Sequence, residues 1–210
     1  MSENSAAQNQ IKQMLTMQNA MNSRVSETWQ ENGYEWYRAI WVECAEMLDH
    51  HGWKWWKHQE IDVAQVQLEL VDIFHFGLSL RIDGITSYEK IAKQLEQELS
   101  TAYQADDFKQ TLEVLAASAV ADKTFNAAAF AGCMAKIGMN IDDLYRGYVG
   151  KNTLNFFRQD HGYKDGSYIK VWGGQEDNEH LVEVVKSLDT EHADFAKLVY
   201  EGLEARYPTK

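Results

Sequence analysis

Apolar residues recur every three or four positions along most of the chain, which is the period of an α-helix with one buried face. This spacing predicts helices in eight segments: 7–22, 34–51, 63–81, 86–103, 107–121, 125–138, 141–161 and 178–206. The first eight residues are polar and are expected to fray. Since no repeat or linker interrupts the pattern, we predict an all-α, single-domain helical bundle over residues 1–210.

Residues that favour helix ends support several of these boundaries. Asp62 and Asn140 precede predicted helices and can accept hydrogen bonds from their first backbone N–H groups. Thr86 and Glu89 have the spacing of a capping box, in which both side chains bond backbone donors. The segment 163–175 breaks the helical pattern with three glycines and predicts an ordered loop.

Four acids occupy unusual positions on the second and third predicted helices. Glu43 and Glu69 each lie inside the apolar stripe of their helix, and Glu46 and Asp72 follow three residues later on the same side. Converging carboxylates cannot all stay ionised without a cation between them, and Mg²⁺ prefers oxygen ligands. The pattern therefore predicts a divalent metal site of two facing acidic helices, although solvated acids on exposed helices would give the same spacing.

The composition limits the classes of partner. The formal net charge is −12, which disfavours binding to nucleic acid or to an anionic membrane surface. No apolar run is long enough to cross a bilayer, and the N-terminal residues do not resemble a signal peptide. Cys44 and Cys133 are expected to be buried free thiols, so we predict a cytoplasmic protein.

One segment, 151–172, reverses the acidic balance, with four cations against two acids. Lys151, Asn155 and Arg158 are spaced by four and three and so share one helix face. A lysine, an amide and a guanidinium directed the same way suit phosphate oxygens. The same spacing would also fit an exposed basic face paired with the acidic bulk. Together with the predicted metal site, however, the row indicates a nucleoside polyphosphate site.

His75 follows Asp72 by one turn and allows a different interpretation. Di-iron carboxylate bundles use Glu-x-x-His pairs, but only one histidine fits that pattern here. The same residues would also suit a pyrophosphatase of this fold that acts on another nucleotide, or a helical interaction module without catalytic activity.

Several motifs resemble those of the dimeric dUTPases, which belong to the all-α nucleoside triphosphate pyrophosphatase superfamily. The acidic and aromatic motifs are Glu43-Cys-Ala-Glu46, Trp53-Lys-Trp-Trp-Lys57 and Glu69-Leu-Val-Asp72-Ile-Phe-His75. The later motifs are Lys151-Asn-x-Leu-Asn155-x-Phe-Arg158, Gly162-Tyr163-Lys164 and Glu176-Asp-Asn178. Met17-Gln18-x-x-x-Asn22 is similar to the family's N-terminal motif, so the resemblance extends from about residue 10 to 180.

The resemblance implies a role for each matched position. Two or more Mg²⁺ ions would be bound by Glu43, Glu46, Glu69 and Asp72, with Glu43 or Glu46 also acting on the attacking water. The phosphates would be bound by Lys151, Asn155, Arg158, Tyr163, Lys164 and Lys170. The nucleoside would be bound by Gln18, Asn22, Trp55, His75 and Asn178, with Trp53 and Trp56 as competitors of Trp55. The expected activity is hydrolysis of dUTP, and of dUDP, to dUMP by a homodimer.

Overall fold

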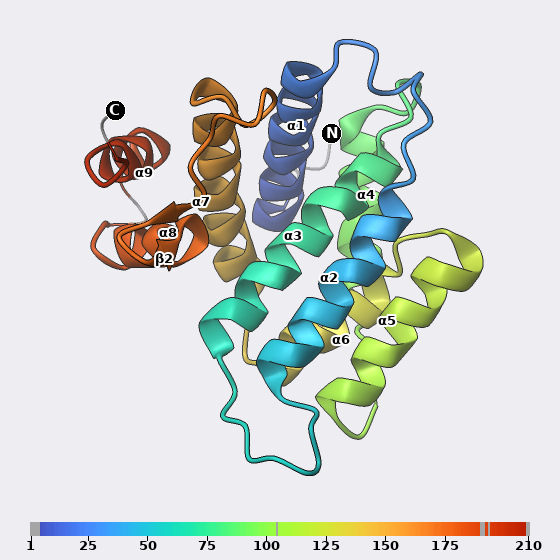
Figure 1. The fold of residues 1–210 in the computed structure, drawn as a ribbon. Helices are drawn as coiled ribbons and strands as arrows, with labels where there is room; N and C mark the ends of the chain where they lie inside the picture. The colour runs from blue at the N-terminus through green and yellow to red at the C-terminus, as the bar shows by residue number, and fades with distance from the viewer. Residues whose placement is uncertain (1–4, 104, 190–191, 193, 209–210) are drawn as a thin grey trace. The chain divides into compact units, whose positions relative to one another are not determined.

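The computed structural model describes residues 5–103, 105–189, 192 and 194–208 (Figure 1). It forms two compact units, Met1–Gly147 and Tyr148–Lys210, and each is described by itself. Of the described residues, 66% are helical, which confirms the predicted all-α class. No helix within the described ranges is both long and apolar enough to span a membrane.

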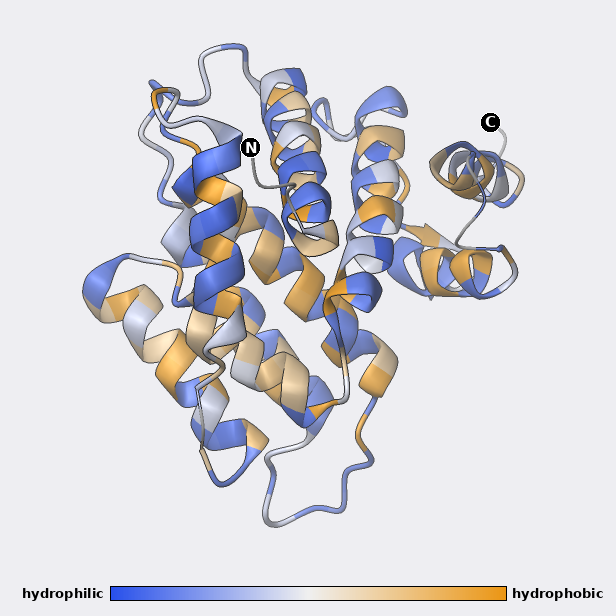
Figure 2. Cartoon of the chain, turned by 180° about the vertical axis from the view of Figure 1, so that it is seen from behind, coloured by the Kyte–Doolittle hydropathy of each residue, from blue (hydrophilic) through white to orange (hydrophobic). Residues whose placement is uncertain are grey.

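The first unit contains six complete helices and the start of a seventh. They are α1 (Ala6–Val25), α2 (Trp36–His51), α3 (Val63–Arg81), α4 (Tyr88–Ser100), α5 (Phe108–Asp122), α6 (Ala127–Lys136) and the first part of α7 (Ile141–Asp160). Figure 1 shows α2 lying between α3 and α5, and α1 packs against α4. Orange apolar positions alternate with blue polar ones along these helices, as expected for elements with one buried face (Figure 2).

Helix α3 forms the core of the first unit. Its residues from Val66 to Ser79 are mostly buried, including Glu69 and His75. Phe74 on α3 contacts Phe125 and Phe130, with ring centroids 6.0 and 5.4 Å apart. A helix surrounded in this way places any polar side chain that it carries inside the protein, where the side chain needs a partner.

The second unit contains the rest of α7, a two-stranded hairpin and two helices. The hairpin pairs β1 (Val171–Trp172) with β2 (Gln175–Glu176) in antiparallel register, and α8 (Asp177–Lys186) and α9 (Phe195–Glu204) follow. Gly173 and Gly174 form the turn with φ of 58° and 91°, which glycine adopts without a steric penalty. The hairpin lies in the segment that was predicted to be an ordered loop.

Several predicted boundaries differ from the structure by a few residues, and three of the differences have a local cause. Residues 6–8 do not fray, because the Ser5 side chain accepts a hydrogen bond from the Gln8 backbone and caps α1; residues 1–4 lie outside the described part. Thr86 does not cap α4, since its hydroxyl bonds Asp83 and Ser87 is the cap. The predicted helix 178–206 is two helices, and the first ends at Ser187, whose hydroxyl donates to the Val184 carbonyl.

Candidate functional site

Three of the four predicted metal ligands come together between α2 and α3. One carboxylate oxygen from each of Glu43, Glu69 and Asp72 lies within 4.8 Å of the others. Glu69 is only 5% exposed, and the other two acids are half-buried. Helical geometry explains the convergence, because Glu69 and Asp72 are one turn apart on α3, and α2 packs along that face.

Glu46 does not belong to this group within the described residues, and its side chain is exposed. Helix α2 buries Ile40, Cys44 and Met47, and Glu43 borders that stripe. At about 100° of rotation per residue, Glu46 lies about 60° farther from the stripe than Glu43 does. The spacing of three therefore put both acids near one side of α2, but only Glu43 reaches α3.

The donor set of the acidic group fits a hard divalent cation. It offers only carboxylate oxygens, one of them from a buried side chain, and burying several carboxylates together is costly without a counter-charge. His50 adds a weak contact, since its Nε2 lies 3.6 Å from Glu69 Oε1. Carboxylate oxygens of this kind suit Mg²⁺, Ca²⁺ and Mn²⁺.

The tryptophan-rich segment lies in the loop between α2 and α3. Trp55 is 89% exposed, and Trp53 and Trp56 are 43% and 58% exposed. The indole of Trp56 makes edge contacts with both neighbours, at centroid distances of 5.3 Å. Asp49 fixes one side of the loop by accepting hydrogen bonds from Trp53 Nε1 and Lys54 Nζ. No tryptophan of this loop is buried, so all three rings are accessible to a ligand or a partner.

Three of the predicted nucleoside-binding residues form a buried polar network between α1 and α3. His75 Nδ1 lies 2.6 Å from Gln18 Oε1, and Gln18 Nε2 donates to Asn22 Oδ1 at 2.9 Å. Ser79, which sequence analysis did not select, accepts from Gln18 Nε2 at 2.9 Å and from Asn22 Nδ2 at 3.0 Å. These four side chains belong to residues that are only 3–6% exposed.

The predicted cation row lies on α7 in the second unit and contacts the start of α8. Lys151 Nζ donates to Asn178 Oδ1 at 2.8 Å. Arg158 Nη1 donates to Asn155 Oδ1 at 3.2 Å, and the guanidinium lies 5.7 Å from the centre of the Tyr163 ring. Arg158 Nη2 also lies 3.4 Å from Asn178 Oδ1, so the row Lys151, Asn155 and Arg158 is joined by hydrogen bonds to Asn178, and Tyr163 packs beside it.

The strongest partner of Arg158 is Asp177, a residue that sequence analysis did not assign to the site. Arg158 Nε donates to Asp177 Oδ2 at 2.7 Å and Nη2 donates to Oδ1 at 2.9 Å, while the Tyr168 hydroxyl also donates to Oδ2 at 2.9 Å. Burial of Asp177 opposes its ionisation, but the hydrogen bonds and charge of Arg158 outweigh burial and lower the pKa of the carboxyl. Desolvation, followed by the nearby Asp177 charge, raises the pKa of Tyr168 well above its usual range.

The remaining predicted phosphate ligands are exposed. Tyr163 and Lys164 lie in the turn that follows α7, and Lys170 precedes β1. Lys170 Nζ lies 2.9 Å from Glu176, and this hydrogen bond raises the pKa of Lys170. None of these three side chains has the burial that fixes Arg158 and Asp177.

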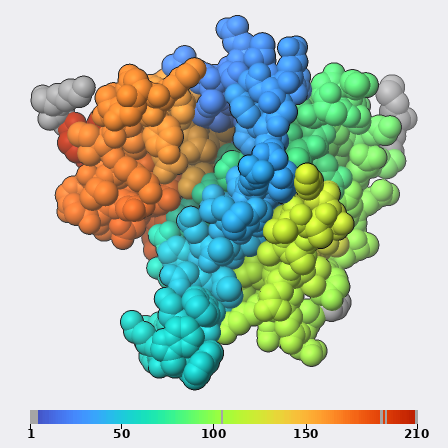
Figure 3. Space-filling model, turned by 45° about the vertical axis from the view of Figure 1, so that its right-hand side comes forward, coloured from blue at the N-terminus to red at the C-terminus, as the bar shows by residue number. Residues whose placement is uncertain are grey.

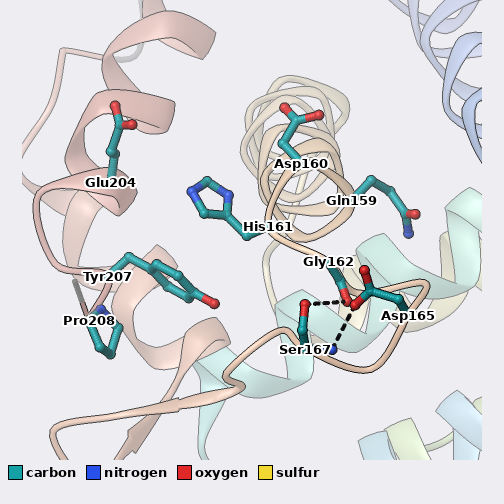
Figure 4. Close-up of a pocket in the computed structure, with 9 residues that line it drawn as sticks. All are labelled: Gln159, Asp160, His161, Gly162, Asp165, Ser167, Glu204, Tyr207 and Pro208. Atoms are coloured by element: carbon teal, nitrogen blue, oxygen red, sulfur yellow. Dashed lines mark hydrogen bonds between the residues drawn. The ribbon is translucent and has the colours of Figure 1, made fainter. Parts of the chain in front are cut away.

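A separate pocket of about 610 Å³ lies within the second unit (Figure 4). Its lining residues come from the end of α7, the following turn and the end of α9: Gln159, Asp160, His161, Gly162, Asp165, Ser167, Glu204, Tyr207 and Pro208. In Figure 4, Ser167 and Asp165 are hydrogen-bonded beside Gly162, and the pocket carries three acids and no lysine or arginine. Such a lining is unsuited to phosphate, so the pocket does not compete with the cation row.

Two residues of the site were missed for different reasons. Ser79 is a small polar residue one turn after His75, and nothing in its spacing separates it from an ordinary core serine. Asp177 was quoted only as part of the Glu176-Asp-Asn178 motif, although it begins α8, where a carboxylate interacts favourably with the helix dipole. Its helix-starting position was the available signal.

A family model described as dUTPase matches residues 10–163 of the chain. The match includes the acidic group, the buried polar network and the first part of the cation row. None of the curated proteins compared with the chain matches it significantly.

Proposed function

Because the chain belongs to the dimeric all-α dUTPase family, whose activity is that of a nucleotide pyrophosphatase, we propose that it hydrolyses dUTP to dUMP and pyrophosphate. We include dUDP as a second substrate, which would give dUMP and phosphate. Removing dUTP in this way would limit the incorporation of uracil into DNA. The observation that carries the proposal is the group formed by Glu43, Glu69 and Asp72 inside the family match.

The acidic group is the proposed Mg²⁺ site. Glu43, Glu69 and Asp72 would be direct ligands, and Glu46 would join them by turning its exposed side chain or by acting through water. Bound there, Mg²⁺ would neutralise charge on the phosphate chain and favour ionisation of water. Two or more ions are proposed, since four carboxylates carry more charge than one divalent cation compensates.

The chain's own acids would activate the attacking water. In-line displacement at phosphorus needs a water molecule held opposite the leaving group and a base that takes its proton. Glu46 is suited to act as that base, because it lies one turn from Glu43 on α2 and is not itself part of the acidic group. Glu43 is the alternative base, and a proton would pass from the water to a carboxylate oxygen of either residue.

The cation row would bind the phosphate chain. Lys151, Arg158 and the exposed Lys164 and Lys170 supply positive charge in an otherwise acidic chain, and Tyr163 adds a hydroxyl donor. Charge that develops on the leaving phosphate would be stabilised by these donors. A covalent intermediate is not required, since water is the nucleophile.

The buried network would recognise the base. Gln18, Asn22 and His75 carry groups that can match the alternating acceptors and donor on the edge of uracil, and Asn178 would contact the sugar. Trp55 is the proposed stacking residue because it is the most exposed of the three tryptophans in its loop, with Trp53 and Trp56 as alternatives. Steric exclusion at the 5-position would reject thymine.

The protein is also proposed to be a homodimer that forms through α2 and α5. A groove of about 320 Å³ between these helices is lined almost entirely by apolar atoms, and Trp41 and Val120 on it are 41% and 58% exposed. Figure 3 shows the two helices side by side on one face. Each copy carries a net charge of −12, so the copies repel each other in general. An apolar face with few acids is therefore the surface through which they could associate.

The dimer proposal is tested by light scattering on a size-exclusion column. Val120→Asp should yield monomers, whereas Val63→Asp, which changes an exposed valine at the start of α3, should leave the dimer intact. If both variants and the wild type had the mass of one chain, the dimer would be excluded. The single-domain organisation and the cytoplasmic location remain predictions.

The activity is tested by measuring pyrophosphate release from a panel of deoxynucleoside triphosphates, with and without Mg²⁺. The proposal expects release from dUTP in Mg²⁺ only, and phosphate release from dUDP. Glu46→Gln should abolish turnover, while Glu60→Gln, in the exposed loop before α3, should not. Release from dCTP but not dUTP would overturn the substrate, and near-normal activity of Glu46→Gln would overturn the role of Glu46.

A further inference from the structure

Asp177 is placed at the cation row by two short elements. It is the first residue of α8, and its backbone N–H donates to the Lys170 carbonyl at 3.0 Å, which ties the helix start to the hairpin. Its side chain is completely buried. A buried carboxylate is retained only with strong partners, and here Arg158 and Tyr168 supply three hydrogen bonds.

The pairing determines which edge of Arg158 can meet an anion. A guanidinium has five N–H groups in one plane, and its Nε and Nη2 edge is one of those that bind phosphate through two parallel bonds. Asp177 occupies that edge. A phosphate that approaches Arg158 must therefore come from the Nη1 side, at the end of the guanidinium where Nη1 donates to Asn155 Oδ1 at 3.2 Å and Nη2 lies 3.4 Å from Asn178 Oδ1.

The same cations orient two neighbouring amides. Lysine and arginine only donate hydrogen bonds, so the oxygen of an amide bonded to them must face the cation. Lys151 and Arg158 thus hold the Oδ1 atoms of Asn178 and Asn155. The Nδ2 group of each amide is then the donor that does not bond the cation. The row then presents ammonium, guanidinium and amide donors together, which is the chemistry that a polyphosphate needs.

We propose that Asp177 is a positioning residue that acts through Arg158: it fixes the guanidinium so that its Nη1 side, and the Asn155 amide bonded there, are directed at a polyphosphate. The inference rests on the proposed function, because it takes the cation row as the phosphate-binding group. Asp177 is not a ligand of the substrate in this role. Its charge would repel phosphate if the guanidinium did not cover it.

The test is a double-mutant cycle read by calorimetric binding of inorganic triphosphate in buffer that contains MgCl₂. Arg158→Ala and Asp177→Asn should each weaken binding by about tenfold, the equivalent of one charge-assisted hydrogen bond. The double variant should bind as weakly as Arg158→Ala alone, because Asp177 has no effect once its target is removed. If the double variant lost affinity by the product of the two single-variant factors, the proposal would be overturned.

Two further variants keep the test decisive. Tyr168→Phe removes one bond to Asp177 and should weaken binding less than Asp177→Asn does, again only when Arg158 is present. It carries the test if Asp177→Asn fails to fold, and unchanged triphosphate binding would then overturn the proposal. Glu183→Gln is the matched control, since it removes an exposed carboxylate from the same helix, where it pairs with Arg206, and should bind as the wild type.

Binding and turnover separate this inference from the proposed function. If the wild type binds triphosphate in an Arg158-dependent way but does not hydrolyse dUTP, the function fails and the positioning role stands. If dUTP is hydrolysed but Arg158→Ala binds triphosphate as the wild type does, the positioning role fails. In the active enzyme, Asp177→Asn should raise KM for dUTP more than it lowers kcat.

Discussion

Arg158 and Asp177 form a two-point ion pair, with Nε 2.7 Å from Oδ2 and Nη2 2.9 Å from Oδ1. Arg158 is 14% exposed and Asp177 is fully buried, so water screens the pair little. The pair joins α7 to the first residue of α8. The positions of the cation-row side chains depend on this contact, because it holds α7 and the start of α8 together.

The pair predicts a characteristic dependence of stability on pH. The folded-state pKa of Asp177 is lowered, so its contribution is fully present above the unfolded-state pKa, about 3.9, and is lost as pH falls through the folded value. Asp177→Asn should cost roughly 3 kcal/mol near neutral pH, because it leaves a buried cation without its charge partner. The difference between wild type and variant should shrink below about pH 4.

Urea unfolding of both proteins across the acidic range measures this difference. A gap that stays constant down to the lowest pH would mean that ionised Asp177 does not stabilise the fold.

Glu69→Gln should separate stability from metal binding. Glu69 is 5% exposed and lies among two other carboxylates, so removing its charge relieves repulsion in the metal-free protein. We expect the melting temperature without metal to be unchanged or higher, and the increase on adding MgCl₂ to be largely lost. Thermal denaturation with and without MgCl₂ measures both effects, with Glu60→Gln as control. An undiminished metal-induced increase would argue against the acidic group as the Mg²⁺ site.

Gly77→Ala should destabilise the first unit. A Cβ at this position in α3 would lie 2.7 Å from Phe125 Cγ, and Phe125 is held between Phe74 and Phe130. The expected cost is about 1–3 kcal/mol, even though alanine is the better helix former. Gly150→Ala is a suitable comparison, since its Cβ would meet a Val185 methyl group at 3.2 Å. Equal midpoints of urea unfolding for the two variants would contradict the packing argument.

The two cysteines should be unreactive in the folded protein. Burial raises the pKa of Cys133 to about 12, and burial, followed by the charges of Cys133 and Glu43, raises that of Cys44 further. Thiolate is the reactive form, so a disulfide reagent should label almost no thiol at about pH 8. After denaturation, two thiols per chain should react with the reagent. Rapid labelling of the native protein would show that one of these sites opens.

Sequence periodicity located the helices because each has one apolar face, and α3 begins and ends at the predicted residues, Val63 and Arg81. It failed where a local hydrogen bond ends or starts a helix. Ser187 closes α8, and Ser5 starts α1 before the predicted residue, through single side-chain bonds that the apolar pattern does not encode. The hairpin was missed because two-residue strands are too short to show alternation.

The convergence of acids at the candidate site was predictable from residue type and helical spacing. Glu43, Glu69 and Asp72 converge as the two acidic pairs suggested. Glu46 shows the limit of that reasoning, because Glu43 already lies at the edge of the buried stripe of α2 and a spacing of three turns Glu46 about 60° farther away. Asp177 shows another limit, since its partner Arg158 is nineteen residues away in sequence and only the fold joins them.

The hydroxyl of Ser79 determines where the protons lie in the buried network. It has one proton, and that proton is directed to the His75 carbonyl at 3.0 Å. Its oxygen must then accept from both amides, which turns the Gln18 oxygen toward His75 Nδ1. With Gln18 and Asn22 reversed, two amide oxygens would face Ser79 with a single proton between them. In this arrangement the imidazole of His75 donates from Nδ1 to Gln18 Oε1. A serine that is not proposed to contact the substrate would thus set the direction of every hydrogen bond among the three side chains proposed to recognise the nucleobase.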